Sequence, residues 1–152
     1  MNLDAHSLLS YHSRVSLAHR YVCLTVPKVA CTTIQAVLHA WEGLAIAPIV
    51  RVHTEGQRLG SLSPGEFARV CRDPEFLWFA FVRNPYTRLA SAYRDKIANP
   101  QEHGYDWLKQ LLQAAGVTDF AGFVRYLRET TDTTIKFDGH FDVQARILDA
   151  PA

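Results

Sequence analysis

The apolar residues of this chain form short continuous runs that predict strands. Residues 21–26 and 76–82 are β-type runs, and the second is apolar throughout, as expected of a strand covered on both faces in a parallel sheet. Residues 45–52 form a third candidate strand, although Pro48 interrupts it. Helical repeats separate these runs. The pattern therefore predicts an α/β fold in which a parallel sheet is flanked by helices.

Two of the helical repeats directly follow a predicted strand. The first is expected to begin at Thr32 or Thr33, with a threonine as its N-cap, and its apolar positions are Ile34, Val37, Leu38 and Trp41. The second is expected to begin at Pro85 behind the N-cap Asn84, because proline has no N–H to lose at the first helical position. Its apolar face consists of Tyr86, Leu89, Ala90, Tyr93 and Ile97.

Three further helices are predicted, and we expect them to cover the core. A capping box at residues 63–66 starts one that runs over residues 64–71. An amphipathic repeat over residues 107–115 ends at Gly116. The last helix starts at Thr118 or Asp119, and its apolar face is Phe120, Phe123, Val124 and Leu127. A polar loop over residues 130–139 is expected to follow.

Composition narrows the classes of function. Lys and Arg number 16 against 15 Asp and Glu, so the net charge of +1 favours no nucleic-acid partner and any anion site must be local. Cys23, Cys31 and Cys71 lie far apart without CxxC spacing, which indicates neither a disulfide framework nor a zinc site. No apolar run is long enough for a membrane span. We therefore expect residues 1–152 to form a single cytoplasmic domain.

The first strand-to-helix turn carries a candidate anion site. Lys28 supplies a full positive charge, and the start of the next helix supplies free backbone N–H groups. The layout is that of a phosphate-binding loop, although it lacks the glycines and the lysine position of GxxxxGK[ST]. A surface lysine with no ligand is the alternative interpretation. The residues of this loop are Pro27, Lys28, Val29, Ala30, Cys31, Thr32 and Thr33.

The second strand-to-helix turn carries another candidate anion site. Arg83 leaves the end of the predicted strand, Ser91 lies about two turns into the helix, and the helix amino end adds partial positive charge. A guanidinium and a hydroxyl in this arrangement suit a phosphate. The alternative is that Arg83 and Arg88 are solvated or form ion pairs with Asp95 and Glu75.

His53 is a candidate general base. It follows the third candidate strand and is expected near the carboxyl edge of the sheet, where ligands of open α/β folds gather. A neutral imidazole accepts a proton near pH 7. The alternative is that His53, one of seven histidines, is merely exposed in a loop.

Three stretches of the chain closely resemble the sulfotransferase family 2 group of carbohydrate sulfotransferases, which includes the HNK-1 and chondroitin/dermatan types. Residues 26–33 are similar to the family's PK-x-x-[CS]-T-[ST] loop. Residues 81–96 are similar to its [FV]-VR-[DHN]-P-[FY]-x-RL-x-SAY-[RK]-x-K segment. Residues 140–144, HFDVQ, resemble its H-[FW]-x-x-Q stretch, so the resemblance extends from about Tyr21 to near the end.

This resemblance implies a P-loop nucleotide-kinase-like α/β fold and a sulfotransferase of the EC 2.8.2 type. It implies that the co-substrate is 3′-phosphoadenosine 5′-phosphosulfate, that no metal is required, and that the acceptor is a carbohydrate or another compound with a hydroxyl group. Lys28, Cys31, Thr32 and Thr33 would hold the 5′-phosphosulfate, and Arg83 and Ser91 the 3′-phosphate. Lys28 would also be catalytic. His53 is the expected general base, with Glu55 and His140 as alternatives.

Two other functions remain open at this point. A kinase or triphosphatase with a P-loop-like site is disfavoured by the missing GK[ST] and by the lack of an evident acidic magnesium ligand after a strand. A nucleotide-binding remnant without transfer activity is the other, since the family's members are usually longer and membrane-anchored. We expect the carboxyl-terminal part that shapes the acceptor site to be short or missing in residues 1–152.

Overall fold

The computed structural model describes residues 12–44, 52–53, 55–130 and 138–148. These residues belong to two compact units, which are described separately. The first unit consists of Met1–Val82 together with Gln144–Ala152, and the second is Arg83–Val143. Most of the candidate strand over residues 45–52 and most of the predicted polar loop lie outside the described residues.

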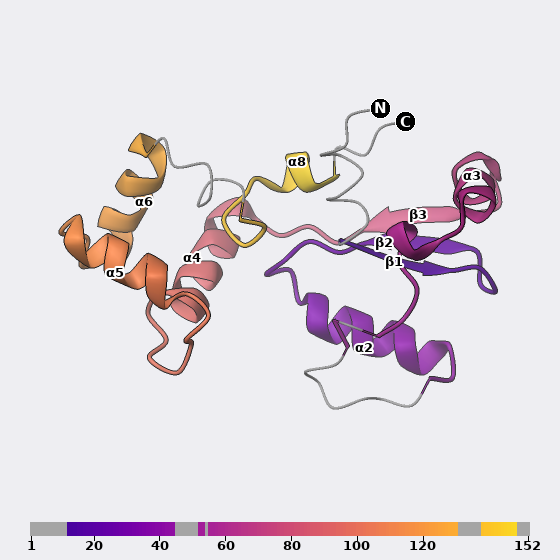
Figure 1. The fold of residues 1–152 in the computed structure, drawn as a ribbon, viewed down its shortest axis with the longest axis horizontal. Coiled ribbons are helices and arrows are strands. Elements are labelled where there is room, and N and C mark those ends of the chain that lie inside the picture. Colours follow the sequence, from indigo (N-terminus) through magenta and orange to yellow (C-terminus); the bar gives the residue numbers. More distant parts are fainter. Residues whose placement is uncertain (1–11, 45–51, 54, 131–137, 149–152) are drawn as a thin grey trace. The chain divides into compact units, whose positions relative to one another are not determined.

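A small three-stranded sheet forms the centre of the first unit (Figure 1). Its strands are β1 (Ser13–Ser16), β2 (Tyr21–Leu24) and β3 (Leu77–Ala80), in the order β1-β2-β3. β2 pairs with β3 in parallel, as predicted, but it pairs with β1 antiparallel. The described sheet is therefore mixed, and the prediction of a purely parallel sheet was wrong because β1 was not foreseen.

Both faces of this sheet are covered. On one face α2 (Cys31–Trp41) packs through Leu38 against Tyr21 and Cys23 of β2. On the other face lie the 3-10 helix η1 (Leu59–Ser61) and α3 (Pro64–Arg72). The core on that side consists of Val15, Val22, Leu59, Val70 and Phe76. Alternate residues of β2 point to opposite faces, so this short strand contributes to two clusters.

β3 differs from the expectation of a strand covered on both faces. Phe76 is buried, but Leu77 is 64% exposed and Val82 is 65% exposed. Within the described residues β3 lies at the edge of the sheet and pairs only with β2. The apolar run over residues 76–82 thus marked a strand correctly but did not show how much of it would be covered.

α2 begins one residue earlier than predicted, and only part of its predicted apolar face is buried. Its N-cap is Ala30 in the left-handed conformation, with no side-chain cap, so the predicted threonine cap was wrong. The predicted apolar positions Val37 and Trp41 are 62% and 58% exposed. Leu38 is buried and Ile34 packs against the same cluster, as predicted, and Gln35 and His39 are buried beside them. Two polar side chains therefore lie in the interface between α2 and the sheet.

The remaining predicted helices are present in the described part of the chain, although Tyr86, on the predicted apolar face of α4, is 82% exposed. Ser63 and Glu66 form the predicted capping box at the start of α3. In the second unit, Asn84 accepts hydrogen bonds from the N–H groups of Tyr86 and Thr87 at the start of α4 (Pro85–Lys96). α5 is Asp106–Ala114, and α6 is Phe120–Glu129 with Asp119 as its N-cap. Their shared core is Leu108, Leu112 and Phe123. A short helix, α8 (Gln144–Leu148), returns to the first unit.

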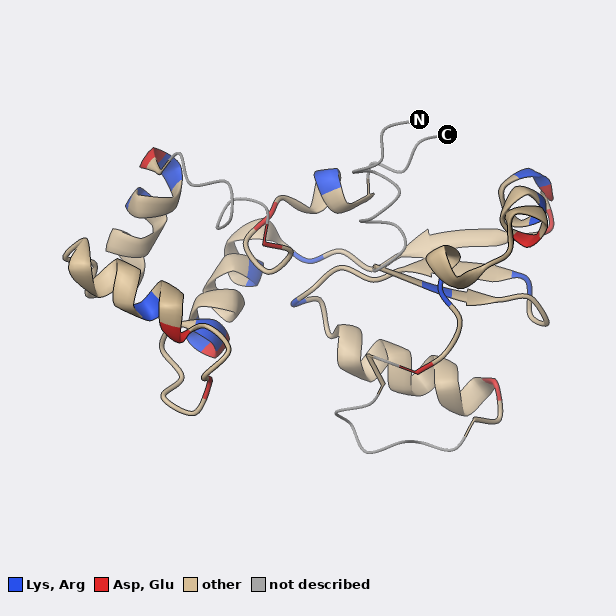
Figure 2. Ribbon diagram, in the orientation of Figure 1, with Lys and Arg blue, Asp and Glu red and all other residues tan. Residues whose placement is uncertain are grey.

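Charges on the first unit are distributed unevenly among the helices. α3 carries both signs, whereas α2 has no Lys, Arg, Asp or Glu along its length (Figure 2). In the parts of the chain that the structure describes, no three His, Cys, Asp or Glu residues gather as they would around a metal ion. None of the helices described is both long and apolar enough to cross a membrane.

We expect His39 to make the stability of the fold depend on pH. Its burial, and then the positive charge of Arg14, lower the pKa of its imidazole. Below the ordinary histidine pKa of about 6.5 the unfolded chain therefore binds more protons than the folded chain, and the free energy of unfolding falls as pH drops. Urea denaturation at about pH 7.5 and about pH 5.5 measures this difference.

The variant His39→Leu is the control, because it removes the titrating group and puts an apolar side chain of similar size in the same buried position. We expect its free energy of unfolding to change less between the two pH values than that of the natural protein. An unchanged pH dependence in His39→Leu would show that another group is responsible.

Candidate functional site

The loop between β2 and α2 has a backbone suited to anion binding. Lys28 and Ala30 have φ angles of 69° and 68°, which are uncommon for residues other than glycine. A left-handed residue directly before a right-handed helix turns successive N–H groups into one concavity, and the first N–H groups of a helix have no intrahelical acceptor. No acidic residue lies in the first turn of α2. The backbone of this loop therefore fits the predicted phosphate-binding layout.

The loop is held in place by apolar contacts beneath it. Val26 and Val29 are buried and pack with Ile147 of α8. Ile34, in the first turn of α2, also packs against this cluster. These contacts fix the two valines on either side of Lys28, which is itself partly exposed. The strained backbone of the loop is thus supported by its own side chains, as is common where strain serves a function.

His53 lies against this loop. Its Nε2 is 2.8 Å from Oγ1 of Thr32, a residue 21 positions earlier in the chain. Its backbone carbonyl accepts a hydrogen bond from the Arg58 guanidinium. The structure therefore brings His53, which is exposed, into contact with Thr32, the residue four positions after Lys28.

Two further residues complete this arrangement, and sequence reasoning missed both. Gln35 Nε2 is 3.0 Å from Nδ1 of His53. Arg14 Nη2 donates to Gln35 Oε1 at 3.1 Å and to the carbonyl of Val52 at 2.8 Å. Arg14 is 1% exposed, and its burial lowers the pKa of its guanidinium. The only available signal was a glutamine close to the apolar positions of the predicted helix, and it matches no motif.

Gly56 leaves room for the Arg14 guanidinium, and we expect Gly56→Ala to destabilise the protein. A Cβ at this position would lie 1.2 Å from Arg14 Nη1, and the φ angle of 87° disfavours any L side chain. The free energy of unfolding should fall by at least about 1 kcal/mol. Urea denaturation measures the change. Gly65→Ala is the control, because its Cβ in α3 meets nothing within 4 Å and alanine favours a helix; an equal loss in both variants would contradict the expectation.

The second candidate anion site lies at the start of the second unit. Arg83 is exposed, and its Nε donates to Thr87 Oγ1 at 3.2 Å. Ser91 lies in the second turn of α4 and is partly exposed. Arg83 comes three positions after the last residue of β3, and Asn84 and Pro85 then start the helix, as predicted. The local layout of strand, arginine and helix start is therefore present.

Arg88 is not solvated, contrary to one of the interpretations considered for it. It is 4% exposed and is neither solvated nor paired with Glu75, whose carboxylate lies 3.5 Å from Arg20. Its guanidinium donates to the carbonyls of Asp142 at 2.6 Å and Gly139 at 2.7 Å. Arg88 thus fixes the stretch that resembles the family's H-[FW]-x-x-Q segment onto α4.

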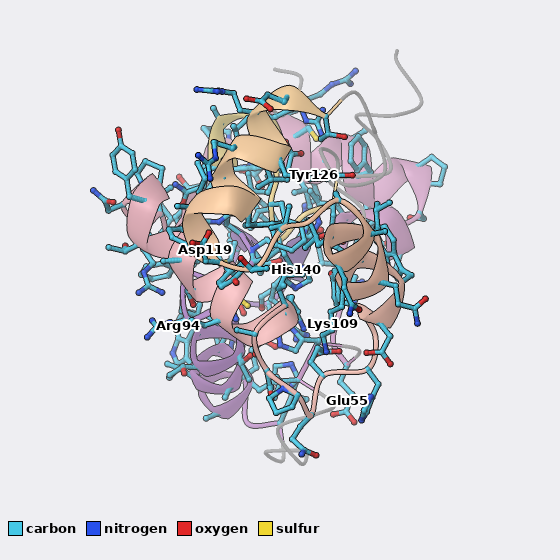
Figure 3. All side chains as sticks on the ribbon, turned by 90° about the vertical axis from the view of Figure 1, so that its left-hand side faces the viewer. Glu55, Arg94, Lys109, Asp119, Tyr126 and His140 are labelled. Carbon is cyan, nitrogen blue, oxygen red and sulfur yellow. The ribbon has the colours of Figure 1, made fainter. Side chains whose placement is uncertain are left out.

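His140, labelled in Figure 3, lies in the second unit and has polar neighbours there. Its Nδ1 is 3.0 Å from Asp138 Oδ1 and 2.8 Å from the hydroxyl of Tyr105, which lies 2.9 Å from Asp138 Oδ2. Burial opposes ionisation of Asp138, but hydrogen bonds from His140 and Tyr105 outweigh it and lower its pKa. Burial and the hydrogen bond to Asp138 raise the pKa of Tyr105. Asp138 thus favours a proton on Nδ1 of His140.

The residues predicted for donor binding are divided between the two units. Lys28, Cys31, Thr32, Thr33 and His53 belong to the first unit. Arg83 and Ser91 belong to the second. Within each unit the local geometry agrees with the sequence patterns: a strained loop before α2 in one, and an arginine before the capped helix α4 in the other. These assignments of individual residues stay predictions.

Comparison with known proteins identifies the family. The model of a family described as the sulfotransferase family matches residues 11–150. The chain belongs to the sulfotransferase family. This agrees with the resemblance of its two strand-to-helix turns to sulfotransferase family 2. No solved structure matches this family member at a significant level.

Its curated relatives include carbohydrate sulfotransferases. Carbohydrate sulfotransferase 14 of Mus musculus is 32% identical over 130 residues, which cover 76% of this chain and 34% of the relative. The Homo sapiens protein of the same name is 31% identical over 130 residues. Carbohydrate sulfotransferase 8 of Mus musculus is 26% identical over 146 residues, which cover 85% of this chain and 35% of the relative. This member of the sulfotransferase family therefore spans about a third of the length of these relatives.

Proposed function

We propose that this chain binds 3′-phosphoadenosine 5′-phosphosulfate and transfers its sulfuryl group to a hydroxyl of an acceptor, which we infer to be a carbohydrate. Family membership supports the class of reaction. The names of the relatives support the class of acceptor. The observation that carries the proposal is the loop before α2, where Lys28, the helix start and His53 occur together. We infer a P-loop-like fold for the domain from the same family.

In this proposal the loop binds the sulfate-bearing end of the donor. Lys28 contributes a full charge, and the N–H groups of Cys31, Thr32 and Thr33 contribute hydrogen bonds at the positive end of α2. Negative charge builds on the oxygen that bridges phosphate and sulfur as the sulfur–oxygen bond breaks. A cation and oriented N–H groups at that oxygen lower the barrier, because they need no rearrangement as the charge develops. We propose that Arg83 and Ser91 hold the 3′-phosphate of the same donor.

The acceptor hydroxyl must lose a proton during transfer, and we propose that His53 accepts it. Support comes from the 2.8 Å separation of its Nε2 from Thr32 Oγ1, since Thr32 belongs to the proposed sulfate loop. A positioned base contributes roughly 10²- to 10⁴-fold. His140 is the alternative base, because Asp138 favours a proton on its Nδ1 and so favours a lone pair on its Nε2. Glu55 remains a third candidate from the sequence alone.

Two variants decide between the histidines. We expect His53→Ala to reduce kcat by roughly 10²- to 10⁴-fold, the contribution of a positioned base. His140→Ala should then retain most of the activity. The opposite pattern would assign the base to His140.

The experiment that tests the function is a transfer assay with donor labelled in its sulfuryl group and a panel of oligosaccharide acceptors. We expect label to enter at least one acceptor, and to do so without added magnesium. Magnesium-dependent hydrolysis of ATP in its place would favour the kinase or triphosphatase interpretation. Donor binding without transfer to any hydroxyl would favour a binding remnant.

A further inference from the structure

A continuous set of hydrogen bonds links a buried arginine to the proposed sulfate loop. Arg14 of β1 donates to Gln35 of α2, the Gln35 amide contacts His53 Nδ1, and His53 Nε2 contacts Thr32. The link therefore joins four residues from the first strand, the first helix and the segment before η1. Gln35 is 7% exposed and Arg14 is 1% exposed, so solvent does not compete strongly for the contact between them, whereas His53 at the other end is exposed.

The chemistry of Arg14 determines which atom of the Gln35 amide faces which partner. A guanidinium carries only donors, so the Gln35 atom beside it must be the carbonyl oxygen. The other amide atom is therefore the NH2 group, and it must donate to His53 Nδ1. A neutral imidazole has one donor and one acceptor nitrogen. If Nδ1 accepts, then Nε2 carries the proton and donates to Thr32 Oγ1.

We propose that Gln35, held by Arg14, is a positioning residue that keeps the proton of neutral His53 on Nε2 and so directs the hydroxyl proton of Thr32 to the bound anion. Thr32 Oγ1 accepts from His53, and its own O–H then points away from the imidazole. A hydroxyl oriented in this way is a ready donor to a phosphate or sulfate oxygen. The inference deepens the proposed function, on which it rests.

The same tautomer bears on the role proposed for His53 as a base. Its lone pair in the resting protein lies on Nδ1, against Gln35, and not on the Nε2 that faces the loop. Before Nε2 can take the acceptor's proton, the proton of the imidazole must move to Nδ1 and Gln35 must turn its carbonyl oxygen toward it. That rotation breaks the bond from Arg14. Gln35 thus favours donation to the loop in the resting protein.

Nitrogen-15 NMR of the His53 imidazole tests this directly, because the chemical shifts of the two ring nitrogens report which one carries the proton. At about pH 8.5, where an ordinary histidine is neutral, we expect the proton on Nε2. In Gln35→Glu the carboxylate retains one oxygen for Arg14 and presents the other to Nδ1. We expect the proton to move to Nδ1 in that variant.

Two further variants make the result specific. Gln35→Met keeps the volume and removes both hydrogen-bonding groups, so we expect a mixture of tautomers. Ala40→Glu adds a carboxylate to an exposed position of the same helix and should leave the proton on Nε2. A natural protein with the proton on Nδ1, or a Gln35→Glu variant with the proton still on Nε2, would overturn the proposal.

A second measurement tests whether the orientation of the Thr32 hydroxyl affects the affinity for the bound anion. We expect Gln35→Met to weaken binding of adenosine 3′,5′-bisphosphate about tenfold, as a lost hydrogen bond to a charged group does. In a Thr32→Val background the same change should have an effect of less than about twofold, because the oriented hydroxyl is already gone. Equal effects in both backgrounds would contradict the proposal. If the natural protein binds no bisphosphate, the proposed function fails, whereas the tautomer of His53 in the free protein is still decided by NMR.

Discussion

Lys28→Ala is expected to reduce sulfuryl transfer about 10²- to 10³-fold in kcat. The physical reason is that the lysine supplies the only full positive charge within residues 25–33, whose N–H groups contribute partial charges alone. A steady-state assay with labelled donor measures the loss. The fold should remain intact, because Lys28 is partly exposed and Val26 and Val29 on either side of it keep their contacts with α8.

The control for this variant is Arg72→Ala, which removes one exposed positive charge from α3 in the same unit. We expect its kcat to remain within about twofold of the natural value, since exposed charges distant from a site act weakly through water. If Lys28→Ala retained full activity, or if both variants lost the same amount, Lys28 would have no specific role in transfer.

Arg88→Ala is expected to lower the free energy of unfolding of the second unit by about 3 kcal/mol. The variant leaves the carbonyls of Asp142 and Gly139 without the charged donor that they have at 2.6 Å and 2.7 Å. A hydrogen bond to a charged group contributes about 1.5–3 kcal/mol, and an unsatisfied buried carbonyl adds a penalty. Urea denaturation followed by the fluorescence of Trp107 in α5 measures the change.

Arg94→Ala is the matched control, because Arg94 lies on the same helix and is exposed (Figure 3). Its loss should change the free energy of unfolding by less than about 0.5 kcal/mol. Hydrogen exchange of the amides of residues 138–143 should become faster in Arg88→Ala and stay unchanged in Arg94→Ala. Equal stabilities of the two variants would show that the contacts of Arg88 with these carbonyls do not stabilise the fold.

Local chemistry explains which elements could be predicted from the sequence. The cap at Asn84 and the capping box at Ser63 depend on residues within one helical turn, and both occur in the structure. The face that α2 buries depends on its partners instead. Val37 and Trp41 fit a helical repeat, yet α2 also buries Gln35, because Arg14 of β1 supplies a polar contact to it.

Strand β1 could not be predicted, since only one of its four residues is apolar and its pairing with β2 is a tertiary property. The exposure of β3 was missed for a related reason. An apolar run indicates a strand, but the number of strands and helices that cover it depends on the rest of the fold.

The residues of the candidate site also divide into those that the sequence could nominate and those that it could not. Lys28, Thr32 and Arg83 could be nominated because they lie in sequence patterns with a known physical use, next to the start of a helix. Gln35 and Arg14 could not, because no spacing distinguishes them from ordinary polar residues. Their importance follows from the 3.1 Å contact between them and from the contact of Gln35 with His53, which join three distant parts of the sequence.

Calorimetric titration of adenosine 3′,5′-bisphosphate into the protein tests the central claim most directly, with ATP and magnesium as the control ligand. We expect binding in the micromolar range or tighter for the bisphosphate, weaker binding of ATP, and a loss of at least about tenfold in both Lys28→Ala and Arg83→Ala. Folded protein that binds no bisphosphate, or binds it equally well in both variants, would contradict the assignment of the donor site to these residues.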